Sequence, residues 1–86
     1  MFEYDPKKSE ANKIKHGIDF EYAKKLWEDP NRVIIEARTT DEERYLLVVK
    51  LDKKFWSAVF TIRNGSVRVI SVRKSRNNEK EIYFSS

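Results

Sequence analysis

The sequence predicts an α+β domain, and three stretches carry that prediction. Residues 55–73 (FWSAVFTIRNGSVRVISVR) place Asn64-Gly65 between two runs rich in Val, Ile, Phe and Thr, which is the strongest short-range signal for a β-hairpin. Asp5-Pro6 and Gly17 enclose a helix-forming run as an N-cap and a C-terminal stop. Residues 44–51 (RYLLVVKL) are apolar enough to form a central strand covered on both faces.

The remaining elements complete the order β-α-α-β-β-β-α. We expect an antiparallel sheet with both N-terminal helices on one face and a short C-terminal helix at its edge. The second helix has an apolar stripe (Phe20, Ala23, Leu26, Trp27) that is typical of a core-facing helix. In chain order we expect a short strand at residues 1–4, a helix from Pro6 to about His16, and a second helix capped by Asp19 and ended by Asp29-Pro30. Strands at residues 32–37 and 44–51 follow, with a polar loop at residues 38–43 between them. The hairpin comes next, and the last element is a helix from Arg76 to about Phe84 with Ser75 as its N-cap.

The register of the hairpin decides which of its side chains reach the core. A two-residue loop would put Arg73 opposite Trp56 and mix charge into the apolar face. A three-residue loop, residues 63–65, pairs even residues with even ones, and we adopt it. One face then carries Trp56, Ala58, Phe60, Ile62, Ile70 and Val72, with Arg68 as the only misfit, and the other carries Ser57, Thr61, Ser71 and Arg73 with Phe55, Val59, Val67 and Val69.

The composition is that of one soluble globular domain spanning residues 1–86. The chain is 40% hydrophobic and 37% charged, with two Gly and two Pro, which argues against disorder. It has no cysteine, so we expect no disulfides, and a cytoplasmic location fits. No apolar run approaches the ~20 residues of a membrane span, and the polar start is not that of a signal peptide.

Positive charge is concentrated in the second part of the chain. Residues 1–52 carry ten Lys/Arg against twelve Asp/Glu, whereas residues 53–86 carry eight against two. Seven cations lie between Lys53 and Asn78 with no acidic residue among them. This is either a solvated basic face or a surface that binds a polyanion, because unpaired cations repel one another until an anion binds.

Four phrases of the sequence resemble the BrnT family of toxins from type II toxin–antitoxin systems: FEYDPKKSEANKIKHGIDFEYA, DEERYLLVVK, AVFTIR and RVISVRKSRNNEKEIY. The resemblance implies a RelE-like ribonuclease fold and a toxin that blocks translation by cutting RNA. It also implies a ribbon-helix-helix antitoxin similar to BrnA, in a 2:2 complex that binds operator DNA. Val72 stands where the family usually has Ala. The functional set that the resemblance implies is Arg63, Arg73, Lys74, Glu79 and Tyr83.

These residue types suit RNA cleavage in which the 2′-OH attacks the adjacent phosphate. Such a site needs a base, cations for the phosphoryl oxygens and an acid for the leaving oxygen. Arg63 and Arg73 suit the cationic role. Glu79 is a candidate base or a residue that orients an arginine, and Tyr83 could stack on a base or donate a proton. The expected RNA contacts are Lys74, Arg76, Arg68 and Lys15.

Plainer interpretations stay open at this stage. Glu79 and Tyr83, four residues apart, could be a pair on a helix surface, and Arg73 an exposed strand end. His16, the only histidine, suits the end of a helix better than catalysis. One His and no Cys leave no usual zinc spacing, and we expect no cofactor. The alternative function is a non-catalytic module that binds nucleic acid or a protein through the same basic face.

Overall fold

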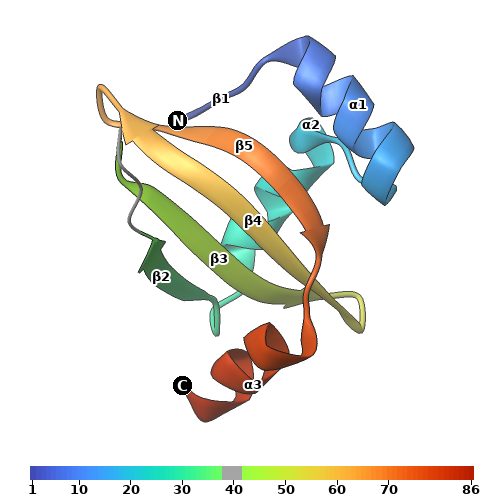
Figure 1. Ribbon diagram of the computed structural model, residues 1–86, viewed down its shortest axis with the longest axis vertical. Coiled ribbons are helices and arrows are strands. Elements are labelled where there is room, and N and C mark those ends of the chain that lie inside the picture. The colour runs from blue at the N-terminus through green and yellow to red at the C-terminus, as the bar shows by residue number, and fades with distance from the viewer. Residues whose placement is uncertain (38–41) are drawn as a thin grey trace.

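The computed structural model describes residues 1–37 and 42–86, and it contains a five-stranded sheet in the order β1-β5-β4-β3-β2 (Figure 1). The pairs β5–β4, β4–β3 and β3–β2 are antiparallel, but β1 is parallel to β5, so the sheet is mixed rather than antiparallel throughout. In chain order the elements are β1 (Phe2–Glu3), α1 (Pro6–His16), α2 (Phe20–Ala23), the 3-10 helix η1 (Lys24–Glu28), β2 (Val33–Ala37), β3 (Arg44–Leu51), β4 (Lys54–Arg63), β5 (Ser66–Lys74) and α3 (Asn77–Ser85).

The expected order of elements is confirmed, with one change in the second helix. That helix continues beyond Ala23 as the 3-10 helix η1. Four residues of the expected loop, residues 38–41, lie outside the described part of the chain. Within the described residues, no helix is long and apolar enough to span a membrane.

Helix α1 begins and ends at the predicted caps. Asp5 Oδ1 accepts a hydrogen bond of 2.9 Å from the N–H of Lys7, and Pro6 is the first helical residue. Gly17 adopts a φ of +81° and donates its N–H to the carbonyl of Lys13 at 2.9 Å. This left-handed conformation ends the helix, and glycine adopts it without a steric cost.

Polar contacts, rather than an apolar stripe, hold α1 against the sheet. Its buried residues are Ser9 and Asn12, whereas Ile14 is exposed. Asn12 Nδ2 donates to the carbonyl of Val72 at 2.9 Å, and Asn12 Oδ1 accepts from the N–H of Val72 at 3.1 Å. Because β1 covers only Val67 and Arg68 of β5, Asn12 satisfies the open edge of that strand further along.

The main core lies between one face of the sheet and the segment α2–η1. The predicted stripe of that segment is confirmed, since Phe20, Ala23 and Leu26 are buried and Trp27 packs against them. Strand β3 is covered on both faces, as expected: Leu47 and Val49 lie in this core, and Val48 is fully buried outside it. The sheet contributes to the core Leu47, Val49, Trp56, Ala58, Phe60, Val69 and Val72.

The hairpin closes with a two-residue loop, so the predicted three-residue loop is wrong. Arg63 pairs with Ser66, and Asn64 and Gly65 have φ values of +50° and +80°. Positive φ at both loop positions is the pattern of a type I′ turn, whose twist matches that of the flanking strands. Asn-Gly is the dipeptide that most favours this turn.

A β-bulge at Ile70 then changes the register of the hairpin. Phe60 pairs with Val69, but the next pair along β4 is Val59 with Ser71, so Ile70 has no partner. From there the pairing continues through Ala58–Val72, Ser57–Arg73 and Trp56–Lys74. Because of this one-residue insertion, side chains after Ile70 point to the face opposite the one that strict alternation along β5 would give them.

The bulge corrects part of the predicted core face. Val69 takes the place in the core that was predicted for Ile70, and Val67 packs against the core as well. Ile62 is 48% exposed because it lies next to the turn, at the end of the strand. The prediction is confirmed for Trp56, Ala58, Phe60 and Val72, which are buried.

Helix α3 covers the second face of the sheet rather than its edge. Figure 1 shows it at one end of the sheet, away from α1. It packs against β3, and its Tyr83 and Phe84 rings contact the ring of Phe55 at 5.5 and 5.3 Å. The other half of this face, toward the Asn64-Gly65 turn, is not covered by α3 (Figure 1).

We expect Phe60→Ala to lower the free energy of unfolding by about 3–5 kcal/mol, because it empties a buried aromatic site. The Phe60 ring lies 5.3 Å from the rings of Trp27 and Tyr45, and only 3% of the residue is exposed. Ile62→Ala, on the same strand but exposed, is the matched control and should cost far less. Chemical denaturation measures both, and equal losses would contradict the observed register.

Candidate active site

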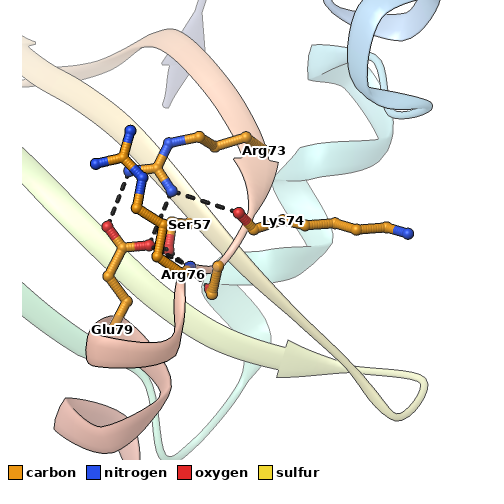
Figure 2. Close-up of polar contacts among 6 residues, drawn as sticks. Ser57, Arg73, Lys74, Arg76 and Glu79 are labelled. Atoms are coloured by element: carbon orange, nitrogen blue, oxygen red, sulfur yellow. Dashed lines mark hydrogen bonds and ion pairs between the residues drawn. The ribbon is translucent and has the colours of Figure 1, made fainter.

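A buried ion pair between Arg73 and Glu79 lies where β5 leads into α3 (Figure 2). Arg73 Nη1 donates to Glu79 Oε1 and Nη2 donates to Oε2, both at 2.8 Å. The carboxylate is 7% exposed and the arginine side chain 24% exposed. The bidentate geometry fixes the plane of the guanidinium, and part of the arginine side chain stays open to solvent.

Two further donors hold the Glu79 carboxylate. Ser57 Oγ, on the neighbouring strand β4, donates to Oε1 at 2.8 Å, and the N–H of Arg76 donates to the same oxygen at 2.9 Å. Ser57 Oγ also lies 2.7 Å from Ser75 Oγ. Because the Ser57 proton goes to Glu79, Ser75 is the donor in this second bond.

Local structure explains why these residues meet. Ser57 and Arg73 are paired across β4 and β5, so their side chains leave the same face of the sheet. Helix α3 begins with Arg76 as its N-cap residue, which corrects the prediction of Ser75. Glu79 is therefore the third helical residue, from which a carboxylate can reach back to the N–H of the N-cap.

The surrounding donors keep Glu79 ionised. Hydrogen bonds from Arg73, and then those from the Arg76 N–H and Ser57, lower the pKa of Glu79 to about 2 despite the opposing effect of burial. The same contact raises the pKa of Arg73. A carboxylate with so low a pKa is a weak base, so this geometry favours the alternative in which Glu79 orients an arginine.

Arg63 lies at the opposite end of β4 from this ion pair. It lies six positions along the strand from Ser57, the partner of Arg73, which corresponds to about 20 Å. Arg63 Nη2 is 3.5 Å from Glu42, and Arg68 Nη1 is 3.3 Å from Glu3. The structure therefore does not bring Arg63 and Arg73 to one point.

Around Arg63 there is a small cationic cleft that the sequence did not predict. Its volume is about 130 Å³, and it lies over the part of the second face that α3 leaves open. Arg44 contributes an Nε that is buried and has no hydrogen-bond partner among the described residues. We call this the arginine cleft; it is lined by Lys8, Glu42, Arg44, Thr61, Arg63, Arg68 and Ile70.

Tyr83 points away from the ion pair. Its hydroxyl donates to Asp29 Oδ2 at 2.8 Å, and burial together with this contact raises its pKa. Asp29 Oδ2 also accepts from the N–H of Lys50 at 2.9 Å. In the structure Tyr83 thus fastens α3 to the residues that follow η1, and within the described residues no hydrogen bond joins it to Arg73 or Glu79.

The expected RNA-contacting residues are dispersed. Arg76 is exposed beside the ion pair, and the Lys74 side chain points away from Arg73 (Figure 2). Lys15 is exposed in the last turn of α1, on a separate element. No group of three metal-ligating side chains occurs in residues 1–37 and 42–86.

Ser57 and Ser75 are site residues that the sequence did not single out as ligands of the carboxylate. Their hydroxyls are 18 residues apart in the chain and meet only through the pairing of β4 with β5. The placement of Ser57 on the same hairpin face as Arg73 was the one signal that could have identified it. Glu79 is buried, so it is not part of a pair on a helix surface, and Arg73 is fixed by its ion pair rather than being a free strand end.

The depressed pKa of Glu79 predicts a loss of stability in acid. Because the folded pKa is about 2 against an ordinary value of 4.5, this carboxylate stabilises the fold fully above pH 4.5. The contribution is lost as the pH falls from about 4.5 to 2, and the difference corresponds to about 3 kcal/mol. Unfolding free energies measured across this range check it. Glu79→Gln should remove this part of the pH dependence, and an unchanged acid profile would contradict the prediction.

Comparison with known proteins places the chain in a family. A model described as the ribonuclease toxin BrnT of type II toxin–antitoxin systems matches residues 4–79, which include Arg63, Arg73 and Glu79 but not Tyr83. No curated protein matches the sequence significantly. The match covers most of the 86 residues, and it agrees with the resemblance noted in the sequence. The chain therefore belongs to the BrnT family of ribonuclease toxins from type II toxin–antitoxin systems.

Proposed function

We propose that this protein is a metal-independent endoribonuclease that cuts RNA and thereby inhibits translation. The observation that carries the proposal is the bidentate Arg73–Glu79 pair, which fixes the guanidinium of a partly exposed arginine on a basic surface. Family membership supports a toxin role and an RNA substrate. The cleavage chemistry and the roles of individual residues are inferred from the geometry.

The reaction needs no group beyond the RNA and the protein. The 2′-oxygen of one nucleotide attacks the adjacent phosphorus, its proton passes to a base, and the bond between phosphorus and the 5′-oxygen breaks. The leaving 5′-oxygen takes up a proton, so the products end in a 2′,3′-cyclic phosphate and a 5′-OH. Charge builds on the phosphoryl oxygens along the way, and a fixed cation stabilises that charge.

Arg73 supplies this cation in the proposed mechanism. Its guanidinium stays protonated at any working pH, and its orientation is set before the substrate arrives. Glu79 acts through Arg73 by holding the guanidinium plane, and Ser57 holds Glu79 in turn. Glu79 is thus a positioning residue rather than the base.

The arginine cleft would hold the RNA on one side of the scissile phosphate. Its arginines lie about 13 to 20 Å from Arg73 along the open half of the second face, which is the span of several nucleotides of a single strand. Arg44 Nε is buried and lies 3.9 Å from Glu42 Oε1, but it makes no hydrogen bond in the described part of the chain and can donate one to a phosphate. Arg63 and Arg68 therefore serve binding in this proposal, as Arg76 does beside the ion pair.

Arg73→Ala should lower the rate of RNA cleavage by about 10²–10³-fold, because it removes the fixed cation at the phosphate. The assay is cleavage of a single-stranded RNA in excess EDTA, with the products tested for 5′-OH ends by direct phosphorylation. Arg32→Ala changes an exposed arginine just before β2; it is the matched control and should cleave normally.

The same assay separates the two roles of Glu79. Glu79→Gln keeps an oxygen that can accept from Arg73 and from the Arg76 N–H, so a positioning role predicts a loss of about tenfold or less. A base would be lost entirely, with an effect as large as that of Arg73→Ala. Parental cleavage by folded Arg73→Ala would refute the proposed role of Arg73, and RNA binding without any cleavage by the parent would favour the non-catalytic module.

We propose further that an antitoxin similar to BrnA neutralises the protein by covering this surface in the cytoplasm. Membership in a type II family implies an antitoxin partner. The 2:2 stoichiometry and the binding of operator DNA rest on the resemblance in sequence. Charge complementarity would speed the encounter, and apolar contacts would then hold the complex.

Direct masking predicts that both Arg63 and Arg73 lose solvent access in the complex. Because Arg63 lies at the turn end of the β4–β5 hairpin and Arg73 lies near its other end, a cover of both must extend along the open half of the second face. Protection of the two side chains from arginine-specific modification, with and without antitoxin, measures this. If activity is lost while both stay accessible, inhibition acts at a distance.

A further inference from the structure

A second basic pocket lies at the end of the sheet, between the β3–β4 turn and the start of α3. Its volume is about 250 Å³. Among the residues that line this pocket, only Lys74 is an RNA contact expected from the sequence. We call it the lysine pocket, and it is lined by Lys53, Lys54, Phe55, Lys74, Ser75 and Lys80.

Within the described residues, the four lysines of this pocket have no carboxylate partner, unlike the arginines on the second face of the sheet. Arg63, Arg68 and Arg73 each lie within an ion pair with a glutamate. Across the described ranges, no ion pair joins Lys53, Lys54, Lys74 or Lys80 to an acidic residue. Four ammonium groups around one hollow repel one another, and an anion bound among them would relieve that repulsion.

An aromatic ring forms part of the same pocket. Phe55 is half-buried, and the Nζ atoms of Lys50 and Lys80 lie 5.6 and 5.8 Å from its ring centroid. The rings of Tyr83 and Phe84 contact Phe55 edge-on and fix its position. Cations beside an aromatic face are the combination that binds single-stranded nucleic acid, because phosphates pair with the cations and bases stack on the ring.

The pocket is continuous in the chain with the ion pair. Lys74 and Ser75 directly follow Arg73, and Ser75 Oγ is linked through Ser57 Oγ to the Glu79 carboxylate. Figure 2 shows the Lys74 side chain leaving the strand on the side away from Arg73. A strand of RNA with one phosphate at Arg73 can therefore cross the β5–α3 connection and enter the lysine pocket.

We propose that the lysine pocket binds the single-stranded RNA on the side of the scissile phosphate opposite the arginine cleft. Its lysines contact backbone phosphates, and Phe55 provides a stacking surface for a base. This inference rests on the proposed ribonuclease function, because that function places the scissile phosphate at Arg73. The aromatic ring and the continuity with Arg73 favour RNA over an acidic protein segment.

The test measures RNA binding in a protein that carries Arg73→Ala, so that the RNA stays intact. The probe is a fluorescein-labelled single-stranded RNA of ten nucleotides, titrated over a range of salt concentrations. Lys54→Ala/Lys80→Ala should weaken binding at least tenfold and reduce the salt slope by about 1.4, since each lost phosphate contact in a single strand lowers it by about 0.7. Lys7→Ala/Lys25→Ala removes two exposed lysines elsewhere and should change neither value.

Two further variants make the result specific. Lys54→Arg/Lys80→Arg should keep the affinity, whereas Phe55→Leu should weaken binding without changing the salt slope. Parental affinity and slope in Lys54→Ala/Lys80→Ala would overturn the proposal. If Lys54→Ala/Lys80→Ala loses binding to a labelled ten-residue polyglutamate while its RNA binding is intact, the proposal is overturned in favour of an acidic protein partner.

Failure of the proposed function gives a different result. If the parent protein binds RNA through these lysines but never cleaves it, the lysine pocket stands and the catalytic proposal fails. If Arg73→Ala still cleaves RNA, the role of Arg73 fails, and the salt slopes of the lysine variants, measured with an RNA whose 2′-hydroxyls are methylated and which cannot be cut, still decide the pocket. If the parent cleaves RNA but the lysine variants bind it normally, only the pocket is refuted.

Discussion

The β-bulge at Ile70 is the constraint on which the rest of this structure depends. Side chains in a strand alternate between faces, so residues separated by an odd number cannot share a face without an inserted residue. Val69 and Val72 are separated by three positions and both lie in the core; Arg68 and Arg73 are separated by five, and both lie on the second face. An unbulged β5 would have to bury one arginine or expose one valine, and burying an unpaired charge costs far more than the local irregularity of a bulge.

The Arg73–Glu79 pair joins the chemistry of the site to the attachment of α3. Glu79 reaches the pair from the first turn of that helix, and Phe55, Tyr83 and Asp29 hold the rest of it. Removing ions from water offsets much of the attraction between them, so a buried pair is more important for geometry than for net stability. Here that geometry is a fixed guanidinium plane. Such a plane is better suited to stabilising charge on a phosphate than to transferring a proton.

The arginines of the second face and the lysines of the lysine pocket differ in whether they have carboxylate partners. Four arginines on the second face lie in ion pairs with glutamates, and the bidentate pair of Arg73 fixes the direction of its guanidinium before any ligand binds. The four lysines of the lysine pocket have no such partner in the described part of the chain, so their long side chains are free to adapt to the backbone of an RNA. A preorganised arginine at the reacting phosphate and adaptable lysines further along form a consistent arrangement for cutting one bond in a flexible strand.

The sequence by itself determined the order of elements, the caps of α1, the apolar stripe of Phe20, Ala23 and Leu26, and the family, because these depend on local propensity, periodicity and residue identity. It also indicated a basic second half and a hairpin at Asn64-Gly65. Only the tertiary structure decided the parallel pairing of β1, the bulge at Ile70, the burial of Glu79 and the separation of Arg63 from Arg73. Each of these depends on which backbone groups and charges meet across distant parts of the chain. Alternation in a single strand gives no signal for an inserted residue, since the insertion is stabilised by packing on both faces of the sheet at once.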